Sequence, residues 1–270
     1  MWSTARLLVG GIFAVALIAI FTTLYTGHTA ASPGLFLSQH GVRIPLRSDL
    51  GLLHVPVVTT SRLAQRYFDQ GIRLLVAFAF PLAAESFRAA QDIDPACALC
   101  VWGEAFALSR NLNDPMNSTL APRVFALSER ALQLAQHAQA SCPSEQAELC
   151  MRDSRICAAA VVRIAPTAAE YEGSLVNLTA RYAHAMAALA PLFPADPTIA
   201  LLAADAIMNL SPWDYWLPGG AALRPQVRPA RDLLQGVLRD WPDHPGAIHW
   251  YIHLMEAGNE AGLTGRAAPE

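Results

Sequence analysis

The residues best suited to chemistry lie near the C-terminus, where His249, His253 and Glu256 occur at intervals of four and three residues. On a helix this spacing places the three side chains on one face. Two neutral imidazoles and a carboxylate suit a divalent ion such as Zn²⁺, Cu²⁺ or Ni²⁺. The alternative is that both imidazoles pack in the core. No Glu comes directly after the first His, as it does in zinc peptidases.

Such a metal site also needs polar groups that orient each imidazole ring. The neighbours Ile252 and Leu254 offer none, so we expect these groups to come from another helix. Three side chains are candidates, namely His184, Asp205 and Asp214. His244, just before the helix, adds a ligand only if its turn folds back.

Five cysteines form a second group with potential chemistry. Cys97 and Cys100 form a CxxC motif that predicts a disulfide, half of a metal site, or two small core residues. Haem attachment is excluded because Val101, not His, comes after the motif. Cys150 and Cys157 are two turns apart, too far to bridge within a straight helix. Cys142 reaches one of them only by a turn, and spacing alone assigns no pairing.

Two polar and aromatic segments form candidate ligand surfaces. One holds Asn111 and Asn113, and the other holds Trp213, Asp214 and Trp216. Short Asn side chains are also ordinary turn formers. The aromatic segment has the alternative role of a plug over the edge of the fold, since aromatic side chains bury large areas.

The composition excludes several classes of function. All 19 basic residues are Arg, so neither a Lys Schiff base nor a phosphate-loop Lys is present. The net charge of −3 gives no basic face for a nucleic acid. No Ser/His/Asp set or pair of carboxylates stands out, and a catalytic role is less expected than a binding role.

The elements that position these residues are predicted to be helices. Apolar residues recur at helical spacing from about residue 61 to 258, and Pro residues separate the segments. We expect eight to ten helices in antiparallel pairs. This helical domain comes after an irregular segment, 32–60, and before a short tail, 259–270, which is consistent with a truncated chain.

The run Ala64–Cys97 resembles one tetratricopeptide repeat. Bulky and small residues fall at the positions of that motif in both helices, in the order Tyr67, Gly71, Leu74, Ala83, Phe87, Ala90 and Pro95. Small residues let two helices approach closely, and Phe fills the gap between them. Gln70 departs from the motif, which usually has Leu there. Similar endings recur at Asp196-Pro197 and His244-Pro245.

Longer stretches resemble a large group of bacterial secreted tetratricopeptide-repeat proteins that have no settled biochemical role. The resemblance rests on three stretches, namely residues 67–71, 94–103 and 244–253. It implies an α-solenoid of stacked helix pairs with a concave surface.

The N-terminus predicts export. Arg6 precedes an apolar run from Leu7 to Phe21, and Thr29-Ala30-Ala31 offers a small-residue cleavage site. If the run extends to Tyr25, it is just long enough to anchor the chain in a membrane. Residues 1–31 are therefore expected to be a signal peptide or a membrane anchor, and the chain from about residue 32 onward is expected to be extracytoplasmic.

Three hypotheses for the function emerge from the sequence. The first is an extracytoplasmic scaffold that binds a protein or peptide partner on a concave surface. The second is a metal-binding protein or metal-dependent enzyme that uses His249 and His253. The third is structural assembly through stacked repeats.

Overall fold

The structure is a computed structural model that describes residues 44–259, so the predicted signal or anchor and most of the tail lie outside it. Within this range the chain is all-helical and forms no strand, which confirms the all-α prediction. The helices of the described range are α2 (Arg62–Val76), α3 (Phe80–Ile93), α4 (Ala98–Leu108), α5 (Ala121–Ala140), α6 (Ala147–Val161), α7 (Ala168–Leu189), α8 (Pro197–Met208), α9 (Arg228–Asp240) and α10 (Pro245–Met255). These nine helices fall within the expected eight to ten.

Local sequence explains where the helices begin. Ser61, Thr167 and Asp196 cap α2, α7 and α8 with side-chain oxygens that accept backbone N–H groups of the first turn. Proline occupies the first or second position of five helices, where its missing N–H costs nothing. Pro81 thus lies in the first turn of α3, after α2 has already ended at Val76.

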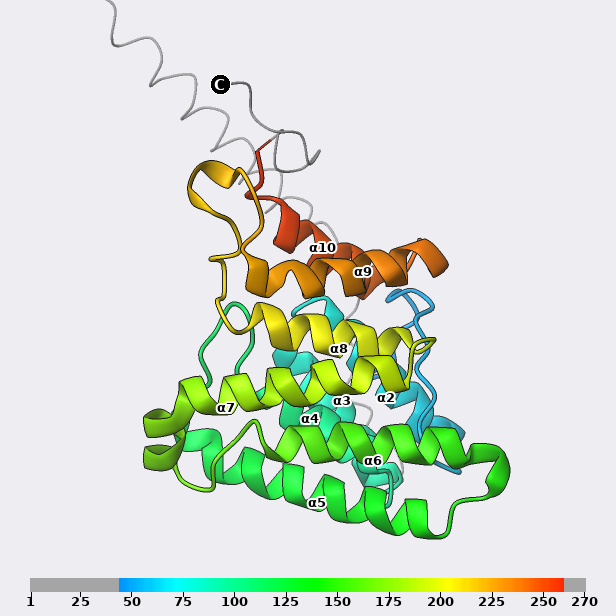
Figure 1. Cartoon of the computed structure of the whole chain (residues 1–270). Coiled ribbons are helices and arrows are strands. Elements are labelled where there is room, and N and C mark those ends of the chain that lie inside the picture. The colour runs from blue at the N-terminus through cyan, green and yellow to red at the C-terminus, as the bar shows by residue number, and fades with distance from the viewer. Residues whose placement is uncertain (1–43, 260–270) are drawn as a thin grey trace, which may run out of the picture.

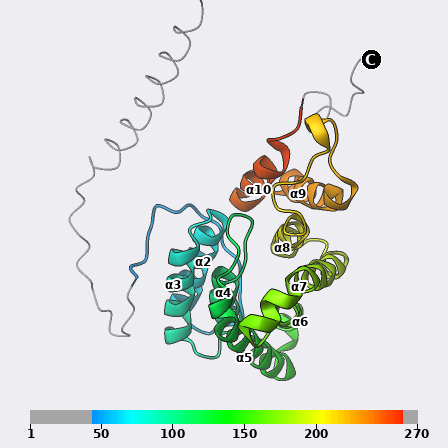
Figure 2. The same cartoon turned by 90° about the vertical axis from the view of Figure 1, so that its left-hand side faces the viewer.

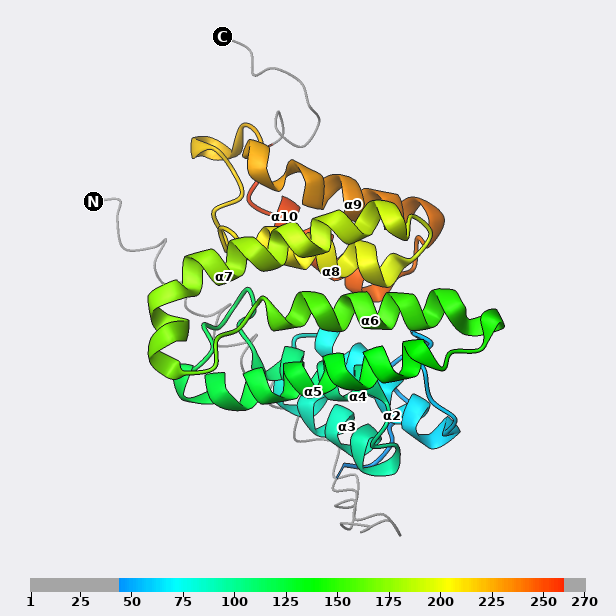
Figure 3. The same cartoon turned by 60° about the horizontal axis from the view of Figure 1, so that its bottom comes forward.

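The helices pack in tandem, each against the next along the chain. They form an arc from α2, α3 and α4 through α5 and α6 to α7–α10 (Figures 1 and 2). Viewed from below, α5 and α6 lie side by side as a long hairpin (Figure 3). The arc returns on itself, because α10 also contacts α2.

Close helix approach at the start of the arc depends on small residues. Ala83 and Ala90 are fully buried, and the ring of Phe87 lies between Gly71 of α2 and Gly103 of α4. A Cβ atom on Gly71 would lie 2.5 Å from that ring, and one on Gly103 would lie 2.4 Å from it. Gly71 therefore lies at a close helix contact, as predicted, and Ala83 and Ala90 lie in the core.

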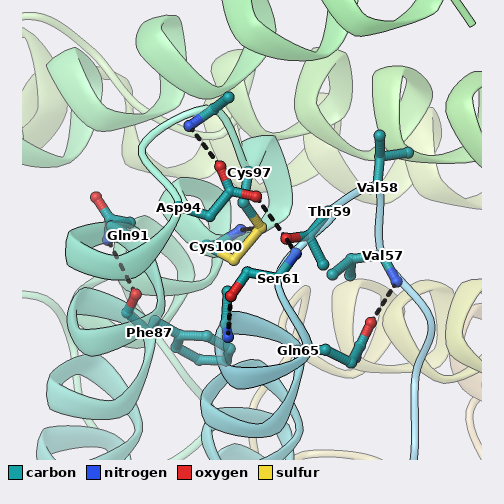
Figure 4. Close-up of a disulfide and its surroundings, with 12 residues drawn as sticks. Val57, Val58, Thr59, Ser61, Gln65, Phe87, Gln91, Asp94, Cys97 and Cys100 are labelled. Atoms are coloured by element: carbon teal, nitrogen blue, oxygen red, sulfur yellow. Dashed lines mark hydrogen bonds between the residues drawn. A yellow bond between two sulfur atoms is a disulfide. The ribbon is translucent and has the colours of Figure 1, made fainter.

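Residues 44–60 precede α2 without helical structure, and we call this segment the strap. Val55 and Val57 of the strap are 5% exposed and belong to the main core. Figure 4 shows the strap descending beside α2, where the Val57 N–H donates to the side-chain oxygen of Gln65. In the same view, Asp94 accepts hydrogen bonds from Thr59 of the strap and from the backbone next to the Cys97–Cys100 disulfide. The strap is therefore part of the folded domain.

None of the helices within residues 44–259 combines the length and apolar character that crossing a membrane requires.

Candidate functional site

The imidazoles of His249 and His253 face each other on α10. Their Nε2 atoms lie 2.9 Å apart, and the ring centroids lie 4.7 Å apart. Metal–nitrogen bonds of about 2.0–2.1 Å place two cis ligands about 2.9 Å apart at right angles and about 3.3 Å apart in a tetrahedron. The two nitrogens therefore have the separation of neighbouring ligands on one ion.

The outer nitrogen of each ring has its own partner. His249 Nδ1 lies 2.7 Å from the carbonyl oxygen of Val76 at the end of α2, and His253 Nδ1 lies 3.1 Å from the Glu256 carboxylate. Because a carbonyl only accepts, His249 Nδ1 carries a proton and its Nε2 is an acceptor. Without a metal, His253 Nε2 must then donate to His249.

Aromatic rings enclose this pair of histidines. Phe78 stacks on His253 with 5.5 Å between centroids and an interplanar angle of 13°, and it also lies 4.4 Å from His249. Trp213 meets His253 edge-on at 5.2 Å. Together these four residues form what we call the histidine–aromatic site. It draws on α10, the α2–α3 connection and the segment after α8.

The backbone at this site is unusual. Phe78 and Trp213, with φ of 59° and 65°, are the non-glycine residues with positive φ in residues 44–259. A bulky side chain in this region carries local strain that the surrounding structure must offset, and such strain concentrates at functional sites. Both strained residues contact His253, so the strain marks the same place as the imidazole pair.

The predicted ligand set differs from this geometry in one respect. Glu256 lies on the Nδ1 side of His253, away from the paired Nε2 atoms, so it orients the ring instead of facing the ion position. Over the described residues, no three His, Cys, Asp or Glu side chains gather closely enough to hold a metal ion. A metal bound here would take two protein ligands, with the rest from solvent or another molecule.

The orienting groups also differ from the expected ones. His184 is exposed on α7, Asp205 bonds Asn209 within α8, and Asp214 pairs with Arg224. We expected another helix to supply the groups that orient the imidazoles. Only α2 does so, through the backbone carbonyl of Val76, which lies next to His249 Nδ1. His244 caps α10, where its Nδ1 accepts the Ala247 N–H, so this nitrogen does not face an ion. Burial lowers the pKa of His244, which keeps this cap neutral.

The two candidate ligand surfaces meet at the histidine–aromatic site only through Trp213. Its indole Nε1 donates to the carbonyl of Leu112, which lies between Asn111 and Asn113. Asn111 closes its own turn by accepting from the backbone of Asn113, and Asn113 is exposed. These two residues therefore form a turn that supports Trp213.

The rest of the aromatic segment is structural. Trp216 is 7% exposed, and its indole Nε1 donates to the Leu254 carbonyl 2.8 Å away. Trp216 therefore covers α10, as the plug alternative predicts. Asp214 points to solvent and forms an exposed ion pair with Arg224 at 2.8 Å.

The cysteines resolve into two disulfides and a buried thiol. Cys97 pairs with Cys100, and Cys142 pairs with Cys150 around the turn that separates α5 from α6. The CxxC motif is thus a disulfide, and the metal half-site alternative is excluded because both sulfurs are bonded. Cys157 is a free, buried thiol whose pKa is raised by burial.

Sequence reasoning missed Val76 and Phe78. Phe78 carried no signal, since a Phe in an apolar run is typical of a core position.

Comparison with protein-family models, curated proteins and solved structures finds no significant match for this chain.

Proposed function

We propose that this chain is an extracytoplasmic helical-repeat protein of the tetratricopeptide type that binds a divalent transition-metal ion at His249 and His253. The observation that carries the metal proposal is the 2.9 Å separation of the two Nε2 atoms, with each Nδ1 held by its own acceptor. Neutral imidazole suits Zn²⁺, Cu²⁺ and Ni²⁺.

Two features support the extracytoplasmic location. The Cys97–Cys100 and Cys142–Cys150 disulfides are the kind of bond that persists in oxidising compartments. The apolar run from Leu7 to Phe21 after Arg6 is typical of an export signal. The mass of the mature protein shows whether that run is retained as an anchor or removed as a signal peptide.

The metal proposal is tested by calorimetric titration with each of the three metals. The wild type should bind one ion, and His249→Ala or His253→Ala should abolish binding. His184→Ala, a change at an exposed histidine on α7, is the matched control and should bind as the wild type does. Equal binding by the His249→Ala, His253→Ala double variant would refute the site.

Competition with protons sharpens this test. The ion would take the place of the proton that lies between the two Nε2 atoms, so the affinity should fall as the pH is lowered, measured by titration at several pH values. An affinity that does not change with pH would place the ion elsewhere.

A second function, a scaffold for an extended peptide, is favoured by how the domain holds its own strap. Gln65 of α2 donates to the Val55 carbonyl at 2.9 Å and accepts from the Val57 N–H at 3.1 Å. Gln70 likewise donates to the Pro45 carbonyl and accepts from the Arg47 N–H. An amide side chain can thus replace a neighbouring β-strand as the partner of a peptide backbone.

The far side of the strap is held by α6. Asp153 accepts from the Val58 N–H at 3.2 Å, and Arg152 donates to the Pro56 carbonyl. Because α2 and α6 are separated by three helices, the strap runs inside the arc between them. The interior of the arc recognises extended backbone mainly through its peptide groups, and Val55 and Val57 are the buried anchors.

The scaffold proposal is tested with a labelled peptide of residues 44–60. The full chain carrying Val55→Asp and Val57→Asp should release its strap to protease and then bind the peptide, whereas the wild type should not. Leu52→Asp, at a position that is 94% exposed, is the control and should behave as the wild type. The proposal is contradicted if the strap of the double variant stays protected from protease. It is also contradicted if the strap is released but the variant does not bind the peptide.

A further inference from the structure

Eight buried side-chain polar atoms have no hydrogen-bond partner within residues 44–259. Four of them belong to neighbouring residues, namely Arg163 Nη1, Tyr182 Oη, Asp205 Oδ2 and Asn209 Oδ1. Tyr182, Asp205 and Asn209 are each at least 95% buried, at 2%, 5% and 3% exposure. Folded proteins rarely leave such groups unpaired, because desolvation without a hydrogen bond is costly.

The four residues are close neighbours from three elements. Arg163 comes just after α6, Tyr182 lies on α7, and Asp205 and Asn209 lie at the end of α8. The Arg163 guanidinium carbon lies 4.7 Å from the Tyr182 ring centroid. Asn209 Nδ2 donates to Asp205 Oδ1 at 3.0 Å, which leaves the second oxygen of Asp205 free.

A small cavity lies against three of the four residues. Arg163, Tyr182 and Asn209 line it, together with Ser109 and Thr179, and it has about 10 Å³ of room for the centre of a water molecule. That is roughly the space for one water. Asp205 adjoins the cavity through its hydrogen bond with Asn209. A larger ligand would have to displace buried side chains.

The chemistry of the four atoms matches one kind of occupant. The Arg163 N–H donates, and burial raises the pKa of Tyr182, which therefore keeps its proton and donates as well. Asp205 Oδ2 and Asn209 Oδ1 accept. A halide would satisfy only the two donors, and an ammonium ion only the two acceptors.

We propose that this interior site binds one water molecule, which accepts from Arg163 and Tyr182 and donates to Asp205 and Asn209. The water completes all four hydrogen bonds and joins the end of α6 to α7 and α8. Asn209 caps α8 immediately before the segment that carries Trp213, so the bound water stiffens the support of the histidine–aromatic site. This inference is independent of the metal and peptide proposals.

A crystal structure of the full chain, grown at about pH 7.5 and soaked in bromide, tests the occupant. We expect a density peak within about 3.2 Å of all four atoms, without anomalous bromide signal. An anomalous peak would identify a halide site and overturn the proposal. The absence of any peak at high resolution would overturn it as well.

Thermal unfolding gives a second test. Tyr182 and Asn209 have no direct hydrogen bond to each other, so the shared water is what couples their hydroxyl and amide oxygens. Tyr182→Phe and Asn209→Ala should each lower the Tm, and the double variant should lose less than the sum by about 2–4 °C. Additive losses would mean that no ligand joins the two side chains.

Discussion

The ring of Phe87 occupies the place where a side chain on Gly71 would lie. A Cβ atom on Gly71 would stand 2.5 Å from the ring, well inside van der Waals contact. Gly103 of α4 also packs closely against the ring, since a Cβ atom on Gly103 would lie 2.4 Å from it. Helices α2, α3 and α4 are therefore joined by one aromatic side chain that packs against two glycines.

We predict that Gly71→Ala destabilises the domain by about 1–3 kcal/mol through overpacking. This loss of stability should exceed the gain of up to about 1 kcal/mol that replacing Gly with Ala gives in a helix interior. Gly173→Ala on α7 is the matched control, because its Cβ would meet nothing within 4 Å and the change should stabilise. Denaturant unfolding measures both variants. An unchanged unfolding midpoint for Gly71→Ala would show that the Phe87 ring does not fill the space beside Gly71.

The fold was predictable because its signals are local. Helical spacing marks the helices, and a Ser or Asp cap or a Pro in the first turn marks where most of them begin. Gly71, Ala83, Phe87 and Ala90 mark one close-packed pair. The return of α10 to α2 was not predictable. It depends on the contact of Gly246 with Val76 and Leu201, which are far apart in sequence.

The site was predictable only in part, for the same physical reason. One helical turn fixes His249 and His253 on one face, so spacing alone identified the pair. The partners of their outer nitrogens depend on tertiary packing, and Val76 acts through its backbone, which no side-chain pattern reveals. Positive φ at Phe78 and Trp213 is likewise a property of the fold, since neither residue type favours it.

The disulfides make a prediction about thiol counts. The native protein should show no accessible thiol, because four cysteines are bonded and Cys157 is buried. After denaturation without reductant, alkylation and mass spectrometry should find one thiol, on Cys157. After reduction all five should react. Modification of Cys97 or Cys142 in unreduced protein would contradict the pairing.

Phe78→Asn should separate the role of the ring from that of the turn. Asn tolerates positive φ, so the α2–α3 connection should form and the Tm should change little. The imidazoles lose the ring that stacks on them, and metal affinity should fall by roughly three- to tenfold, the worth of an aromatic contact. Calorimetry measures the affinity. Phe80→Asn, which removes a ring that stacks on Phe78 and has no ring contact with either imidazole, serves as the comparison and should have a smaller effect.

Asp205 predicts a specific dependence of stability on pH. Burial raises its pKa to about 6, against the lowering effects of Arg163 and Asn209. A raised folded pKa means that the folded state binds more protons than the unfolded state, whose pKa is near 3.9. The stabilising contribution of Asp205 is therefore complete below about pH 4 and is lost as the pH rises through about 6.

The measurement is unfolding of wild type and Asp205→Asn across that pH range. The stability of the wild type relative to the variant should fall by roughly 2–3 kcal/mol between pH 4 and 7.5. Taking the difference removes the other titrating groups, which both proteins share. A constant difference across the range would show that Asp205 does not titrate between folded and unfolded states as its burial requires.

The last prediction distinguishes the two roles that Glu256 can have at the proposed metal site. The structure places its carboxylate 3.1 Å from His253 Nδ1, so Glu256 should act by orienting the ring. Glu256→Gln keeps an oxygen that accepts from Nδ1, but an amide is a poor ligand for a transition metal. If Glu256 only orients His253, the Gln variant should keep most of the affinity, and Glu256→Ala should weaken binding by roughly tenfold. If Glu256 bound the ion directly, Gln and Ala would be equally damaging. Glu148→Gln, at an exposed position on α6, controls for the loss of one negative charge and should leave the affinity unchanged.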